Sequence, residues 1–134
     1  MIVSDDRVAK FVSERTGKAF VPPYTAMGIE RGGEIVGGCL FNVFEGADVH
    51  VSVAGSGWTR GFITAVGEYV FGTLGCERMT AITANEITAT FVERMGGQHE
   101  GVLRNHFGPG IDGIVGGILR HEWKYGNVGP LAHG

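Results

Sequence analysis

The residue pattern changes from strands to a helix between Val53 and Phe62, and this change limits the folds that the sequence can adopt. Before it lie three short stretches that read as strands, at residues 24–29, 34–44 and 47–53. The connections between them are short and rich in glycine, which is typical of antiparallel neighbours. After the change, apolar residues recur at the i, i+4 spacing of a helix, at Phe62, Val66, Val70 and Leu74. The sequence therefore predicts an antiparallel meander whose last strand leads into a helix.

The rest of the chain supplies three further strands and two further helices. One helix is expected between a capping Ser4 and Gly17, and another after a capping Asn85. The further strands are expected at residues 78–84, 98–107 and 113–123. The predicted order is α-β-β-β-α-β-α-β-β, in a single domain of 134 residues with a loosely held tail at 126–134.

Charge and composition exclude several classes of function. The net charge is -3 and the 11 Lys and Arg residues are spread singly, so we expect no nucleic-acid partner. No apolar run approaches the roughly 20 residues of a membrane helix, so we expect no membrane partner and a cytoplasmic location. Cys39 and Cys76 stand alone, as buried reduced thiols would. No metal is predicted, because four histidines lack any ligand spacing: His99, His106, His121 and His133.

The chain has 24 glycines without a fixed period, and some of them are expected to let the backbone approach a ligand. The segment from Gly55 to Gly61 is the best candidate, because a glycine-rich turn that leads into a helix presents free N–H groups and a positive dipole end. A phosphate or pyrophosphate fits such a place. An ordinary flexible connection would give the same pattern, so the segment alone leaves both readings open.

Two other folds use a glycine turn at a strand end. A dinucleotide fold places this turn after the first strand of a parallel βαβ unit, whereas here a meander precedes it. A serine hydrolase requires Gly-x-Ser-x-Gly, whereas this chain has Gly55-Ser56-Gly57. Neither fold matches the sequence.

Several motifs occur in an order that is similar to one known family. Trp58-Thr59-Arg60-Gly61-Phe62-Ile63 resembles an aromatic, glycine, base, glycine, aromatic, small-residue loop, from which Thr59 and Ile63 depart. Three further motifs follow along the chain. They are Tyr69-x-Phe71-x-x-Leu74-Gly75-Cys76-x-Arg78, then Asn85-x-x-Thr88, and then Glu93-Arg94-Met95-Gly96 followed by Glu100-Gly101-x-Leu103-Arg104. From about Gly28 to Tyr125 the chain thus resembles the GCN5-related N-acetyltransferases, closest to the branch that acetylates the N-termini of ribosomal proteins.

The resemblance implies an α/β fold with a mixed, mostly antiparallel sheet, splayed central strands and flanking helices. It implies acetyl-CoA as co-substrate and an amine acceptor, either a small molecule or a protein N-terminus. The strand residues Val51, Ser52 and Val53 would bind the pantetheine arm and supply an N–H to the oxyanion. The other implied cofactor contacts are Trp58, Thr59, Arg60, Gly61, Phe62, Ile63, Asn85 and Thr88.

Proton transfer is the less determined part of this prediction. Primary amines have a pKa near ~10, so a base must take a proton at neutral pH. His50 is the first candidate, because histidine is the residue type that titrates nearest neutrality, although a structural histidine would give the same pattern. Glu30, Glu45 and Asp48 are alternates. Val92 stands where many members of the family carry the tyrosine that protonates the leaving thiolate.

Two further expectations concern assembly and activity. The chain is short, so a homodimer would complete the acceptor pocket that extra helices build in larger relatives. The missing tyrosine at position 92 also leaves an alternative function, a CoA-binding module without turnover that acts as a sensor or interaction subunit.

Overall fold

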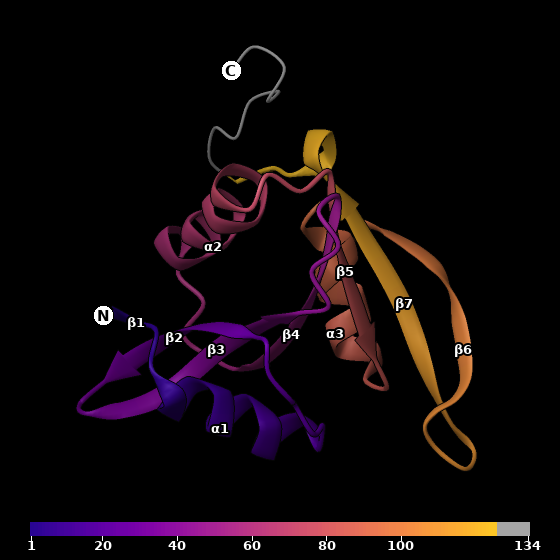
Figure 1. Ribbon diagram of the computed structural model, residues 1–134, viewed down its shortest axis with the longest axis horizontal. Coiled ribbons are helices and arrows are strands. Elements are labelled where there is room, and N and C mark those ends of the chain that lie inside the picture. Colours follow the sequence, from indigo (N-terminus) through magenta and orange to yellow (C-terminus); the bar gives the residue numbers. More distant parts are fainter. Residues whose placement is uncertain (126–134) are drawn as a thin grey trace.

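The computed structural model describes residues 1–125 and shows a mixed sheet with helices on both faces (Figure 1). The strands are β1 (Ile2–Val3), β2 (Thr25–Arg31), β3 (Glu34–Asn42), β4 (Asp48–Gly55), β5 (Arg78–Thr83), β6 (Gln98–Gly108) and β7 (Ile111–Leu119). The helices are α1 (Asp6–Thr16), α2 (Arg60–Gly67), a π-helical segment η1 (Glu68–Thr73), α3 (Glu86–Arg94) and a 3-10 turn η2 (Arg120–Glu122). The predicted loose tail at 126–134 lies outside the described residues.

Within residues 1–125, seven strands form one sheet in the order β1-β2-β3-β4-β5-β7-β6. Every neighbouring pair is antiparallel except β4 with β5. The mixed, mostly antiparallel sheet and the meander β2-β3-β4 are therefore confirmed, and β2 and β3 are joined at Gly32-Gly33, one of the short glycine-rich connections. β1 was not predicted, because a strand of two residues carries no periodic pattern.

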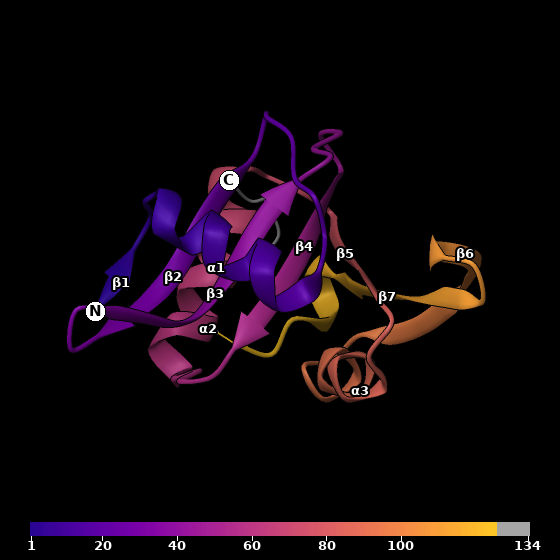
Figure 2. The same ribbon diagram turned by 90° about the horizontal axis from the view of Figure 1, so that it is seen from below.

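The two faces of the sheet are covered by different helices. α1 lies on one face of the β2–β4 half and α2 on the other (Figures 1 and 2). Side chains of β3 alternate between the two cores, as they must in a strand. Leu40 packs with Val8 and Val12 of α1, whereas Cys39 and Phe41 belong to the larger core under α2 and α3. The site described below opens on this larger core.

The ends of α1 are fixed by local chemistry. Gly17 closes the helix in a left-handed conformation, as predicted, and donates its amide to the carbonyl of Ser13. Asp5, and not Ser4, caps the first turn by accepting the amide of Arg7. The carboxylate also accepts the Arg7 guanidinium, which a serine hydroxyl could not pair with as an ion.

The helix predicted to run as far as Leu74 is not one regular α-helix. α2 ends at Gly67, and the chain continues as the π-helical segment η1. There the amide of Leu74 donates to the carbonyl of Tyr69, five residues earlier. The apolar spacing predicted a helix here but could not reveal the extra residue in this turn.

The strand predicted at residues 113–123 ends earlier, because a buried arginine turns the chain inward. β7 stops at Leu119, and the Arg120 guanidinium donates to the carbonyls of Phe71 and Cys76. Carbonyls at a helix end lack intrahelical donors, and a cation is a favourable partner for them. Arg120 therefore stabilises the end of η1 from within the core.

Both cysteines have the environment that their isolation in the sequence predicted. Cys39 and Cys76 are buried free thiols, and burial raises the pKa of each. A raised pKa keeps a thiol protonated and unreactive at neutral pH.

No helix in residues 1–125 is long and apolar enough to cross a membrane.

Candidate functional site

The central strands β4 and β5 separate after a short parallel pairing. The pairing ends at His50 and Thr80. β4 nevertheless continues to Gly55, and β5 to Thr83 (Figure 2). The splayed central strands that the resemblance implied are confirmed, and they form the opening around which the candidate site lies.

The splay leaves backbone groups of β4 without a partner on β5. The backbone carbonyl of Ala47 accepts the amide of Arg78 at the start of β5, so the backbone groups of Ala47 point towards β5. Alternate residues of an extended strand direct these groups to the same side. Val51 and Val53 therefore direct theirs into the opening, where β5 has already turned away.

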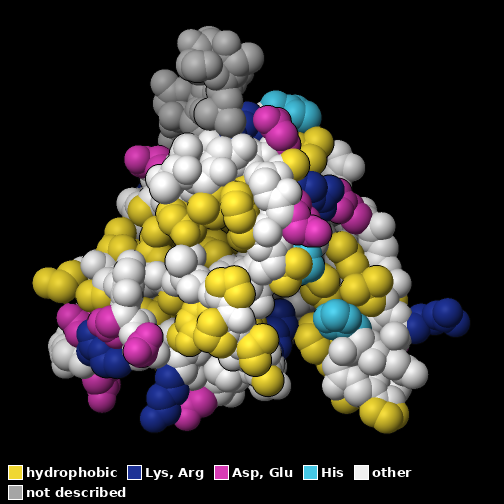
Figure 3. All heavy atoms as spheres, in the orientation of Figure 1, with side chains coloured by type: hydrophobic (Ala, Val, Ile, Leu, Met, Phe, Trp, Pro, Cys, Tyr) yellow, Lys and Arg dark blue, Asp and Glu magenta, His cyan; other side chains and the backbone are white. Residues whose placement is uncertain are grey.

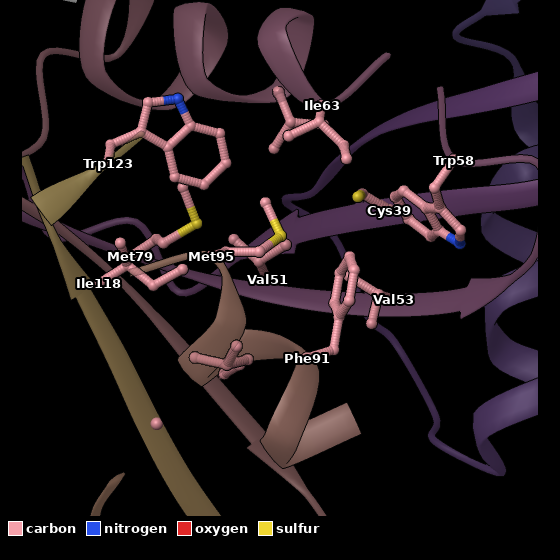
Figure 4. A pocket seen from close by; sticks show the side chains of 14 residues that line it. Cys39, Val51, Val53, Trp58, Ile63, Met79, Phe91, Met95, Ile118 and Trp123 are labelled. Atoms are coloured by element: carbon pink, nitrogen blue, oxygen red, sulfur yellow. The ribbon is translucent and has the colours of Figure 1, made fainter. Parts of the chain in front are cut away.

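A hydrophobic hollow opens at the splay, between α2, α3 and β4 (Figure 4). Ile63 reaches it from α2, Phe91 from α3, and Val51 and Val53 from β4, while Trp58 closes one side. Hydrophobic side chains also gather on the outer surface between α2 and the strands below it (Figure 3). Such a lining accommodates a thin apolar chain, to which the unpaired backbone of β4 offers directed hydrogen bonds.

A larger cleft, of about 1010 Å³, lies at the same two strands and extends to the end of α1. Val51, Val53 and Phe91 line both spaces, so the hollow and the cleft meet at the splay. The cleft adds the segment after α1, with Gly17 and Lys18, which the sequence did not indicate as part of a site. Two routes thus lead to one opening between β4 and β5.

The N-terminus of α2 lies just after β4 and leaves backbone donors free. Thr59 caps the helix, since its hydroxyl accepts the amide of Phe62 at 3.1 Å and its carbonyl accepts that of Ile63 at 3.0 Å. The amides of Arg60 and Gly61 have no acceptor within the helix, because first-turn amides never do. Together with the helix dipole they form a place for an anion.

The predicted loop residues lie together here, but not all of them face outward. Trp58 donates its indole N–H to the carbonyl of Gly55 at 3.2 Å. Phe62 is only 1% exposed and packs edge-on against Trp58, so its side chain belongs to the core. The exposed Arg60 guanidinium lies 5.7 Å from the ring centre of Tyr125, on the solvent side of α2.

The predicted pair at the start of α3 lines the larger cleft. Asn85 caps α3, and its side-chain Oδ1 accepts the amides of Ile87 and Thr88 at 2.7 and 3.3 Å. Asn85 and Thr88 are both among the residues that line the cleft. The capping role and a place beside a ligand are therefore compatible.

His50 lies at the last paired position of β4 but lines neither the hollow nor the cleft. Its Nε2 lies 3.9 Å from the carboxylate of Asp48, one of the alternates for the base. That carboxylate already accepts the hydroxyl of Thr80 at 2.8 Å. Glu30 pairs with Arg7 at the outer part of the sheet, and Glu45 is exposed in the loop before β4.

Val92, which stands where many members of the resembled family carry a tyrosine, lies in the wall of the hydrophobic hollow. No tyrosine in residues 1–125 lines the hollow or the larger cleft. In the same part of the chain, no group of three His, Cys, Asp or Glu residues could hold a metal ion. His133 lies outside the described residues.

Lys18 is the functional candidate that the sequence prediction missed. Its ammonium lies between the splayed strands, where it donates to Ser52 on β4 and to the carbonyl of Ile82 on β5. In the sequence it is a single lysine one residue after a helix-ending glycine, a pattern typical of an exposed residue. Only the position of the end of α1 against β4 reveals its role.

No family model matches this sequence, and no curated protein matches it. Solved structures do match. The spermidine N-acetyltransferase from Vibrio cholerae in complex with CoA and spermine has a TM-score of 0.69 at 12% identity, over 91% of this chain and 96% of that chain. A chain from T. thermophilus described as an acetyltransferase has a TM-score of 0.62 at 23% identity, over 77% of this chain and 62% of that chain.

A further chain described as an acetyltransferase has a TM-score of 0.66 at 23% identity, over 77% of this chain. This chain spans about three fifths of the length of that structure and of the T. thermophilus one. These likenesses confirm the acetyltransferase fold that the sequence motifs implied. The reaction has to be argued from the site, because one fold hosts many functions.

Proposed function

We propose that this chain transfers an acetyl group from acetyl-CoA to a primary amine of a small molecule or a protein N-terminus, by direct attack of the amine on the thioester. One observation carries the proposal: a hydrophobic hollow beside unpaired backbone of β4 lies next to the free amides at the start of α2. Acyl-CoA has the matching parts, a pyrophosphate and a thin arm that ends in the thioester. The spermidine N-acetyltransferase of the same fold was solved with CoA.

The start of α2 suits the pyrophosphate. The amides of Arg60 and Gly61 and the helix dipole favour an anion there. The exposed Arg60 side chain adds a positive charge at the solvent edge. Thr59 holds the turn through its capping hydrogen bond.

The arm of the cofactor would run from this helix into the splay. Val51 and Val53 of β4 would bind it as one strand binds another, since their amides face the opening and have no partner on β5. Ser52 lies between them and would contact the arm from the lining of the cleft. Trp58 and Ile63 form apolar walls along the way. Asn85 and Thr88 lie across the larger cleft, where they would contact the cofactor from α3.

The thioester would then lie at the point where the hollow and the larger cleft meet. A β4 amide directed into the opening would hold the oxyanion of the tetrahedral intermediate. The acceptor amine would enter through the larger cleft, which has room for it. The leaving thiolate needs no tyrosine, because an ordinary thiol has a pKa of about 8.5 and departs as a thiolate near neutral pH.

The proposal is tested by calorimetric titration with acetyl-CoA and, separately, with NAD, followed by an assay of acetyl-CoA consumption with a panel of amines. Tight binding of acetyl-CoA alone, with consumption in the presence of an amine, is the expected result. Binding without consumption by any amine would favour the sensor or interaction module. Binding of neither nucleotide would refute the proposal.

Arg60→Glu is expected to weaken acetyl-CoA binding by about tenfold or more, because the change places a carboxylate beside the pyrophosphate. A tenfold loss corresponds to about 1.4 kcal/mol of binding free energy. The dissociation constant from calorimetry is the measurement. Arg104→Glu is the matched control, because Arg104 is exposed on β6, away from α2, and the change in net charge is the same. An equal loss in both variants would show a general charge effect and contradict the placement of the pyrophosphate.

His50→Ala is expected to lower kcat at neutral pH by about tenfold, in keeping with a base that acts through water. The loss should shrink as the pH approaches ~10, because the free amine then needs no base. The pH–rate profile with saturating acetyl-CoA is the measurement. A profile that is unchanged at every pH would remove His50 as the base.

A cytoplasmic location and a homodimer remain predictions from the sequence.

A further inference from the structure

The side chain of Lys18 spans the opening between the two splayed strands. Its Nζ donates to the carbonyl oxygen of Ile82 on β5 at 2.8 Å and to the hydroxyl of Ser52 on β4 at 3.0 Å. Pairing of β4 with β5 would have satisfied this carbonyl, but it ends two residues earlier, at Thr80. A lysine amine therefore lies in the larger cleft, through which the acceptor amine would enter, beside the splay where the thioester is proposed to lie.

The backbone of Lys18 is held by the end of α1, so this position is built into the fold. The Ser13 hydroxyl donates to the Lys18 carbonyl at 2.7 Å, and the Thr16 hydroxyl accepts the Lys18 amide at 3.3 Å. Gly17 reverses the chain between them. The side chain that extends from this anchored backbone lines the cleft.

The surroundings of Lys18 lower the pKa of its amine, because the group is partly buried beside the strands. No carboxylate in residues 1–125 forms an ion pair with it. The Phe107 ring lies 5.4 Å from Nζ, and Arg15 is the other charged side chain that lines the cleft. Burial lowers the pKa of Lys18, which raises the fraction of neutral, nucleophilic amine at neutral pH.

We propose that Lys18 is an internal acceptor, acetylated on Nζ by the acetyl-CoA bound in the same molecule. The inference rests on the proposed function, because it requires the thioester beside β4. The neutral amine attacks the carbonyl carbon, a C–N bond forms and the C–S bond breaks. CoA leaves as the thiolate, and the proton lost by nitrogen passes through water to that sulfur.

Acetylation would change the site in two ways. The product amide is neutral and has a single N–H, so it cannot donate to both Ser52 and Ile82. The added acetyl group also takes up room in the cleft through which an acceptor enters. Modified protein should therefore bind an external amine more weakly, which makes Lys18 a covalent control of acceptor access.

The test uses the fact that the chain has three lysines, Lys10, Lys18 and Lys124. The purified protein is incubated with acetyl-CoA without any amine, and acetylation of each lysine is followed by peptide mass spectrometry. Lys10 and Lys124 are exposed and report the spontaneous reaction. Lys18 should be acetylated at least about tenfold faster, at a rate independent of protein concentration, because the reacting groups are held in one molecule.

Gly61→Val, which is designed to block the cofactor site, should remove the advantage of Lys18. If Lys18 stays as fast in this variant, the lysine is reactive by itself and the inference is overturned. If acetyl-CoA binds and external amines are acetylated but Lys18 reacts no faster than Lys10, this inference alone fails. If acetyl-CoA does not bind, the proposed function and the inference fail together.

Discussion

Replacing Gly61 by valine is expected to weaken acetyl-CoA binding by about a hundredfold or more, or ~2.7 kcal/mol, while the folded state keeps its stability. A Cβ added at Gly61 would meet only the Thr59 hydroxyl, at 3.9 Å, so nothing in the described protein requires glycine here. The space beside the Gly61 amide is needed only if a ligand comes close to the backbone. Calorimetry for affinity and urea unfolding for stability measure the two parts of the prediction.

Gly72→Val is the matched control for this variant. Gly72 is also helical and exposed, and a Cβ there would meet nothing within 4 Å, but it lies in η1, away from the start of α2. Both variants should unfold at similar urea concentrations, and only Gly61→Val should lose affinity. Unchanged affinity in Gly61→Val would mean that the pyrophosphate does not approach this turn.

The sequence predicted those parts of the fold that depend on local chemistry. Glycine turns and apolar spacing fixed the β2–β4 meander and the position of α2, because each signal lies within a few residues. The same is true of the loop before α2, whose backbone donors at Arg60 and Gly61 follow directly from a helix start. Asn85 was predicted to cap α3, and it does so.

Features that depend on contacts between distant segments were missed. The π-helical turn of η1 and the early end of β7 both involve Arg120, which is separated from Phe71 by 49 residues in the chain. Lys18 lies 64 residues before Ile82, whose carbonyl it contacts. No periodicity links such pairs, so a single sequence carries no signal for them.

The candidate base shows the same limit within the site. A strand pattern places His50, Ser52 and Val53 on β4, but it does not say which of them reach the splay. The structure places Ser52 and Val53 in the lining of the cleft and leaves His50 outside it, beside Asp48. The point at which β4 and β5 separate decides which residues of β4 reach the splay. That point is set by the packing of the whole sheet.

The geometry of the β4 end leads to the largest expected effect on stability. Gly55→Ala should lower the free energy of unfolding by about 3 kcal/mol, as the sum of a left-handed backbone at φ +84° and an overlap with its neighbours. The added methyl would collide with the carbonyl oxygen of Val36 and with the Cα of Gly37, both backbone atoms that cannot rotate away. Urea unfolding of the variant and the unchanged protein measures the difference.

Gly46→Ala separates the two causes. Gly46 has almost the same conformation, φ +82°, but a Cβ there would meet nothing within 4 Å, so only the backbone cost of about 1 kcal/mol should remain. Equal losses in the two variants would show that close contact between β3 and β4 is unimportant. A larger loss at Gly55 would show that this contact fixes the turn that carries Trp58, whose indole binds the Gly55 carbonyl, and with it the start of α2.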